Sequence, residues 1–136
     1  MASEIRIGRV SRIDYKNGLI AVTYGDRDES VTDMLPYLSF NGEYHMPKVE
    51  QYVLVVHVST GEELGIVLGP YWHDGDPPAD SGKDVYRKEF SNTRGKAYAQ
   101  HSGGAFTLKA DSIRFKTSAG SISVADIIAH ITAGTG

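Results

Sequence analysis

Residues 106–131, FTLKADSIRFKTSAGSISVADIIAHI, contain three short segments in which apolar and polar side chains alternate. Each segment places two apolar side chains on one face of an extended strand, because successive side chains point to opposite faces. A lone meander with so few large apolar residues and with open edges is not stable by itself. The faces can be covered by the rest of the chain or by other copies of it. We expect a homotrimer around a common axis, although the pattern also allows a dimer.

A helical pattern follows the three segments. Apolar residues at i, i+3, i+4 and i+7 predict a helix of about two turns that starts near Val124. Ser123 and Asp126 have the spacing of an N-terminal capping pair, and Gly134 is placed to end the helix. The predicted core of the trimer consists of Phe106, Leu108, Ile113, Phe115, Ile122, Val124, Ile127, Ile128 and Ile131.

The first half of the chain carries dense strand signals. Asn17-Gly18 suits a tight hairpin turn, and residues 52–58, YVLVVHV, are apolar on both faces, as in a strand buried on two sides. The segment 59–63 is predicted to turn the chain into the next strand. Five short strands without helical periodicity between them favour a small barrel of the oligonucleotide/oligosaccharide-binding (OB) type. They are predicted at residues 5–15, 19–24, 33–40, 52–58 and 64–68.

A segment rich in proline, glycine and aspartate, residues 70–83, breaks the strand pattern and is predicted to be a linker. The fold class we expect is mainly β: an OB-fold barrel over residues 1–69 and an intertwined trimeric β stalk over 84–124. A short helix and tail over 125–136 complete the chain. The stalk strands are predicted at residues 85–90, 94–101, 106–109, 113–116 and 121–124.

Composition limits the possible partners and compartments. The 136 residues carry a formal net charge of −3, so nothing in the charge balance favours a nucleic-acid partner. The chain has no cysteine, which removes disulfides, thiolate metal sites and a cysteine nucleophile. The sequence shows no signal peptide and no long apolar run, and we expect a protein made in the cytoplasm.

Candidate chemical sites are few. None of the five histidines pairs with another at metal-ligand spacing, and only His130 could gather on a three-fold axis to bind a metal. The segment 72–76, WHDGD, resembles a calcium loop but lacks its ligand spacing. We therefore expect no enzyme activity, no catalytic residue and no cofactor. A possible stacking platform, for which packing is the favoured alternative, consists of Tyr37, Phe40, Tyr44 and Tyr52.

Several motifs resemble the baseplate assembly protein V, or central spike, family of contractile phage tails, which is related to spikes of tailocins and type VI secretion systems. The most specific is residues 65–72, GIVLGPYW, and the others are residues 7–10, 34–39, 45–49 and 52–56. The family usually has glycine where Glu50 stands and often tryptophan where Met34 stands. Some relatives carry a lysozyme domain, for which residues 69–83 are too short, and some needles end in His-x-His, which this chain lacks.

The resemblance implies a trimer whose barrels seat on a baseplate hub protein and whose C-terminal part leads penetration of the target cell envelope on sheath contraction. It also implies assembly in the bacterial cytoplasm, release as part of a phage tail or tailocin particle, and possible contact with a separate tip protein. The alternative hypothesis is an OB-fold module that binds single-stranded nucleic acid or carbohydrate and carries a C-terminal oligomerisation arm.

Overall fold

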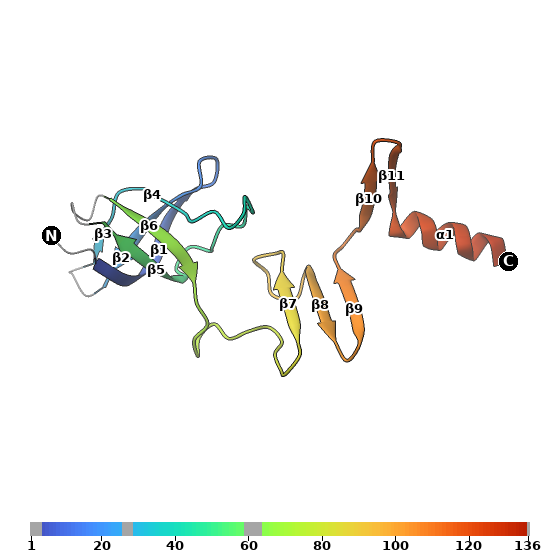
Figure 1. Cartoon of the computed structure of the whole chain (residues 1–136). Coiled ribbons are helices and arrows are strands. Elements are labelled where there is room, and N and C mark those ends of the chain that lie inside the picture. Colours follow the sequence, from blue (N-terminus) through green and yellow to red (C-terminus); the bar gives the residue numbers. More distant parts are fainter. Residues whose placement is uncertain (1–3, 26–28, 59–63, 136) are drawn as a thin grey trace. The chain divides into compact units, whose positions relative to one another are not determined.

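The computed structural model describes residues 4–25, 29–58 and 64–135. The chain divides into two compact units, Met1–Pro77 and Pro78–Gly136 (Figure 1). Strands dominate both units, which confirms the prediction of a mainly β protein. The border between the units falls at Pro77–Pro78, within the segment predicted as a linker. No helix in the described part of the chain is long and apolar enough to cross a membrane.

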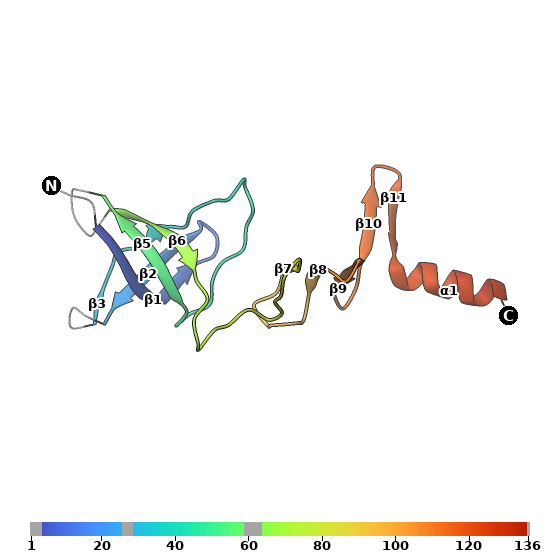
Figure 2. The same cartoon turned by 60° about the horizontal axis from the view of Figure 1, so that its bottom comes forward.

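The N-terminal unit is built from one antiparallel sheet whose strand order is β3-β2-β1-β5-β6. A further short strand, β4, pairs with β2 on one side, and Tyr37 just after it forms a parallel bridge to Val67 of β6. The path of pairing therefore returns to β2, and the strands wrap around one interior (Figure 2). The strands are β1 (Glu4–Asp14), β2 (Leu19–Tyr24), β3 (Ser30–Val31), β4 (Leu35–Pro36), β5 (Tyr52–His57) and β6 (Gly65–Pro70).

The interior of this unit is mostly apolar but also holds a hydrogen-bonded pair of side chains, Tyr24 and His57. The Tyr24 hydroxyl lies 2.5 Å from His57 Nε2, and His57 Nδ1 lies 3.2 Å from the carbonyl oxygen of Leu64. The guanidinium carbon of Arg6 lies 3.8 Å from the centre of the Tyr24 ring. These contacts satisfy polar groups that would be costly to bury alone. The surrounding apolar core is Val10, Ile20, Val22, Leu35, Met46, Val53, Val55 and Val67.

The β1–β2 connection is a four-residue loop, longer than the tight turn expected for Asn17-Gly18. The Asp14 carboxylate accepts hydrogen bonds from the backbone N–H of Asn17 at 3.2 Å and from Asn17 Nδ2 at 2.9 Å. Gly18 has a φ of 67°, which glycine tolerates without steric cost. The same hydrogen bonds from Asn17 lower the pKa of Asp14. The side chain of Asp14, together with the predicted glycine at position 18, therefore determines the conformation of this loop.

The C-terminal unit contains a three-stranded sheet, a separate hairpin and a helix. The sheet has the order β7-β8-β9 and the hairpin pairs β10 with β11, all antiparallel. Gly103 and Gly104, both with positive φ, form the turn between β8 and β9. The elements are β7 (Tyr86–Glu89), β8 (Tyr98–Ser102), β9 (Ala105–Lys109), β10 (Arg114–Thr117), β11 (Gly120–Ser123) and α1 (Val124–Thr135).

Several predicted boundaries are wrong. The strand expected over residues 33–40 is only β4, preceded by β3, and the strand expected over 94–101 begins at Tyr98. Residues before Tyr98 form a turn, in which Lys96 N–H donates to the carbonyl of Thr93 and Gly95 has a φ of 78°. The turn predicted over 59–63 lies outside the described residues. The predicted linker also includes the last residue of β6 and a small bridged turn between His73 and Asp76.

The last three strands do not form one meander, because β9 pairs with β8 and β10 pairs with β11. Ile113 and Val124 lie just outside the hairpin, where Val124 N–H donates to the Ile113 carbonyl at 2.8 Å. The helix has 12 residues, about one turn more than predicted, and runs through Gly134. Its predicted cap is confirmed: Asp126 N–H donates to Ser123 Oγ at 3.1 Å, and Ser123 N–H donates to Asp126 Oδ2 at 3.4 Å.

Candidate functional site: an apolar assembly surface in the C-terminal unit

The β7–β9 sheet has one polar face, which is held by its own side chains. Arg87 pairs with the Glu89 carboxylate, and Arg87 Nη1 donates to Gln100 Oε1 at 2.9 Å. The guanidinium carbon of Arg87 lies 3.5 Å from the centre of the Tyr98 ring. Lys109 Nζ donates to the carbonyl of Gly95 at 3.0 Å on the same sheet. This face therefore has charged side chains with partners inside the unit.

The electrostatics of this polar face follow from the ion pair. The hydrogen bond from Arg87 lowers the pKa of Glu89, and the backbone N–H of Gly95, 2.8 Å from Glu89 Oε1, acts in the same direction. The Glu89 hydrogen bond raises the pKa of Arg87 in turn. Both shifts favour the charged forms. The polar face is thus suited to contact with water.

The opposite face of the same sheet carries exposed apolar side chains, with Lys88 and His101 among them. Register places Tyr86 opposite His101, His101 opposite Phe106, and Ala99 opposite Leu108, and directly opposed side chains share a face. Phe106 is 64% exposed and Leu108 is 48% exposed within the single chain. We call this surface the apolar face of the β7–β9 sheet; it comprises Tyr86, Lys88, Ala99, His101, Phe106 and Leu108.

The hairpin repeats this two-sided pattern. Phe115 of β10 lies directly opposite Ile122 of β11, and both side chains are exposed. Arg114 and Lys116 alternate with Phe115 along β10, so they project from the other face. The predicted core residues Phe115 and Ile122 are therefore brought together by direct pairing. Ile113, which lies before β10, is partly buried.

Helix α1 places the remaining predicted core residues. Val124 and Ile127 are partly buried, and the first of them joins the helix to the base of the hairpin. Ile128 and Ile131 are exposed. The helix therefore carries an apolar stripe of which only the N-terminal part is covered within the chain. A short helix of this kind is stabilised mainly by covering such a stripe.

The structure does not assemble a metal or catalytic cluster from the candidate residues. His130 is exposed on α1, and the described residues contain no group of three or more His, Cys, Asp and Glu side chains that could hold a metal ion. Within residues 72–76, His73 to Asp76 form a bridged turn in which His73 N–H donates to the Asp76 carbonyl at 3.2 Å. Gly75 N–H donates to His73 Nδ1 at 3.2 Å, so the imidazole serves the turn itself.

The aromatic residues proposed as a stacking platform lie in different settings. Tyr37 packs against the core, and burial raises the pKa of its hydroxyl. The exposed Tyr44 donates from its hydroxyl to the Tyr15 carbonyl at 2.8 Å. The Tyr52 ring lies edge-on to His73, with ring centres 5.2 Å apart. Phe40 is exposed. These contacts give three of the four rings a structural role in the N-terminal unit.

Sequence reasoning missed four of the six members of the apolar face: Tyr86, Lys88, Ala99 and His101. The sequence of β7 offered little signal, because Tyr86 is followed by three charged residues, Arg87, Lys88 and Glu89, which is typical of a solvent-exposed strand. Only the register of β7, β8 and β9 shows that Tyr86 shares its face with Phe106.

Comparison with protein-family models gives no match for this chain, and comparison with curated protein sequences gives none either.

Proposed function

We propose that this chain is a structural central spike of a contractile injection machine, of the phage tail or tailocin type, and that it acts as a homotrimer. The observation that carries the proposal is the apolar face of the β7–β9 sheet, with Phe106 and Leu108 about half or more exposed. On the opposite face, the charge of Arg87 is already paired within the unit, with Glu89 and Gln100. An exposed patch of apolar side chains, opposite a face whose charged groups already pair within the unit, is typical of an interaction surface.

The strand connectivity of the N-terminal unit supports an OB-type barrel. The OB-fold is a small, partly open five-stranded barrel. Here β1 pairs with both β2 and β5, and the parallel bridge from Tyr37 to Val67 links the end of β4 to β6, which supports closure of the sheet into such a barrel. This arrangement is compatible with the barrel that the family resemblance of residues 65–72 implies.

The C-terminal unit supports the stalk. Phe115 and Ile122 in the hairpin and Ile128 and Ile131 in the helix add exposed apolar surface beyond the sheet. Three chains that turn these side chains toward one axis bury them together and gain about 25 cal/mol for each Å² of apolar surface removed from water. The role is mechanical: the shared core and the hydrogen bonds between chains bear the thrust of contraction.

The proposal carries the partners and location that the resemblance implies. The trimer would seat on a baseplate hub protein, meet a target cell envelope, and contact a separate tip protein if the particle has one. It would be assembled in the bacterial cytoplasm and released in the particle. No catalytic residue, cofactor or nucleic-acid partner belongs to this function.

Light scattering on the purified chain tests the proposal. The expected result is a mass three times that of the 14.8 kDa chain at micromolar concentration. A monomer under these conditions contradicts it. A monomer that also binds single-stranded oligonucleotides with an affinity that falls steeply with salt would instead favour the OB-fold binding module.

A further inference from the structure

The single tryptophan of the chain, Trp72, lies between β6 and the bridged turn from His73 to Asp76. Trp72 is 74% exposed, although the turn that directly follows it is held by hydrogen bonds. The N–H of Asp76 donates to the His73 carbonyl at 2.9 Å, and Gln51 Nε2 donates to Asp76 Oδ2 at 3.1 Å. A fixed backbone that projects a large aromatic side chain is typical of an anchor residue in a protein interface.

The ring of His73 fixes this turn on the other side. Its centre lies 5.2 Å from that of Tyr52 and 5.7 Å from that of Tyr71. The imidazole therefore lies against one aromatic residue at the start of β5 and one just after β6. With both ends of the turn attached to the sheet, little conformational entropy remains to be lost when Trp72 is buried by a partner.

Beside the turn, the outer face of β1, β5 and β6 is apolar. Register places Ile5 opposite Val56 and Val56 opposite Ile66, which makes one apolar row, and Ile7 opposite Leu54 begins a second. Ile5, Ile7 and Ile66 are exposed. The sequence pattern of residues 52–58 predicted a strand buried on both sides, and this is wrong for the single chain. Its outer side chains, Leu54 and Val56, are only partly covered.

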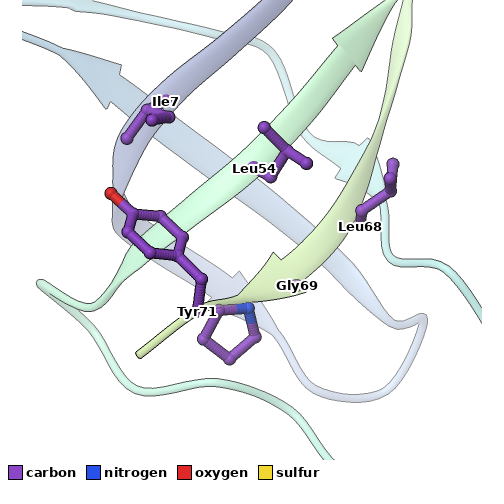
Figure 3. Close-up of a pocket in the computed structure, with 6 residues that line it drawn as sticks. Ile7, Leu54, Leu68, Gly69 and Tyr71 are labelled. Atoms are coloured by element: carbon purple, nitrogen blue, oxygen red, sulfur yellow. The ribbon is translucent and has the colours of Figure 1, made fainter. Parts of the chain in front are cut away.

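The second row contains an apolar pocket of about 270 Å³. Figure 3 shows the Tyr71 ring alongside Ile7 and on the same face as Leu54. The volume lies below the ~300–1,000 Å³ of pockets that enclose a whole small ligand, and it suits a single bulky side chain. The lining is without charge and consists of Ile7, Leu54, Leu68, Gly69, Pro70 and Tyr71.

We propose that Trp72 of one chain enters this pocket on a neighbouring chain of the trimer, so that the N-terminal units close a ring of their own. The inference rests on the proposed function, which supplies the three chains. Trp72 directly follows Tyr71, a pocket residue, and consecutive Cα atoms are about 3.8 Å apart. In a cyclic assembly, a contact between two places so close together on the chain lies near the symmetry axis.

The position of the pocket in the chain favours a second copy of this chain, rather than a different protein, as the partner that fills the pocket. Pocket residues 69–71 end the N-terminal sheet and lead into the connection to the C-terminal unit, which the proposed trimer holds at the axis. A short connection of this kind gives the N-terminal units an effective concentration of about millimolar for one another. A patch smaller than the ~800 Å² per partner of a free-standing complex is then sufficient.

Fluorescence of the full chain tests this inference, because all tryptophan emission comes from Trp72. The wild-type trimer should emit at shorter wavelength than free tryptophan, and its acrylamide quenching constant should be several-fold lower. Ile7→Asp, at the pocket wall, should shift the emission to longer wavelength and remove the protection while light scattering still shows a trimer. Val31→Asp is the matched control, since Ile7 and Val31 are both 55% exposed, and it should leave the spectrum unchanged.

The outcomes separate this inference from the function on which it rests. A wild-type trimer in which acrylamide quenches Trp72 as readily as free tryptophan overturns the ring contact and leaves the stalk trimer standing. Unchanged protection in Ile7→Asp overturns it as well, because the anchor would then lie elsewhere. A wild-type monomer overturns both. The quenching result on the wild type needs no variant, so a poorly folded Ile7→Asp chain does not decide the question.

Discussion

Phe115 and Ile122 lie directly opposite each other across the β10–β11 hairpin, and their side chains are 55% and 45% exposed. An opposed aromatic and β-branched pair stabilises a hairpin, but an isolated two-stranded hairpin is marginal in water. The pair therefore contributes most if a neighbouring chain covers it. This relationship gives the most direct test of the shared core.

Phe115→Asp should dissociate the trimer into monomers while the N-terminal unit stays folded. The reason is that a carboxylate would be buried without a partner in the shared interior. Light scattering gives the mass, and circular dichroism reports the remaining β structure. Ser121→Asp is the control, because Ser121 pairs with Lys116 on the other face of the hairpin. Intact trimers in Phe115→Asp, or dissociation in both variants, would refute the assignment of the inner face.

Tyr24→Phe should lower the free energy of unfolding of the N-terminal unit by about 1–3 kcal/mol, because it leaves the buried His57 Nε2 without its 2.5 Å partner. Denaturant titration followed by circular dichroism measures the change. Tyr44→Phe removes a hydroxyl that bonds to the Tyr15 carbonyl at the surface, where water can replace it. It should cost much less, and equal costs for the two variants would count against the buried hydrogen bond.

Gly8→Ala should destabilise the N-terminal unit by about 1–3 kcal/mol through overpacking. A Cβ at this position would lie 2.3 Å from Val22 Cγ1 and 2.8 Å from the Tyr24 ring, both fully buried. Thermal unfolding compares it with Gly25→Ala, whose Cβ would find its nearest neighbour, Glu29 Oε1, at 3.5 Å. If the midpoint temperature of unfolding of Gly8→Ala equals that of the wild type, the interior around Gly8 is less tightly packed than these distances indicate.

Glu89→Gln should weaken the C-terminal unit at neutral pH but not in acid. Arg87 lowers the pKa of Glu89 below its ordinary 4.5, so the stabilisation is complete above that value and is lost as the pH falls through the lowered, folded pKa. The difference in unfolding free energy between wild type and variant should therefore be largest above the ordinary pKa of 4.5 and shrink as the pH falls below it. Unfolding curves collected across this range check it, and a difference independent of pH would contradict it.

The sequence predicted best where local chemistry decides the structure. Strand β2 has its predicted bounds, and Ser123 and Asp126 make the predicted reciprocal cap. Both follow from neighbours along the chain: a short apolar run after the Asn17-Gly18 turn signal in one case and a spacing of three residues in the other. The helix nevertheless continues through Gly134, because one glycine in a helix costs only about 1 kcal/mol.

Features that depend on distant residues were not predictable in the same way. The family that the sequence resembles usually has glycine at position 50, and Glu50 here has a φ of 74°, a conformation that favours glycine. Its backbone N–H donates to the Val10 carbonyl at 2.7 Å, and its carboxylate accepts from Arg9 Nη1 at 2.8 Å. These contacts to β1 hold the residue in place. The pairing of β9 with β8 likewise depends on register that alternation alone does not give.

The hydrogen bond from Val124 to Ile113 places the entrance and the exit of the β10–β11 hairpin side by side. Tension along a single chain would therefore break the backbone hydrogen bonds of this hairpin one after another, from the Arg114–Ser123 pair toward the Thr117–Gly120 pair. A lone chain offers little resistance to tension in this geometry. In the proposed trimer, contacts with neighbouring chains would have to supply the stiffness under load.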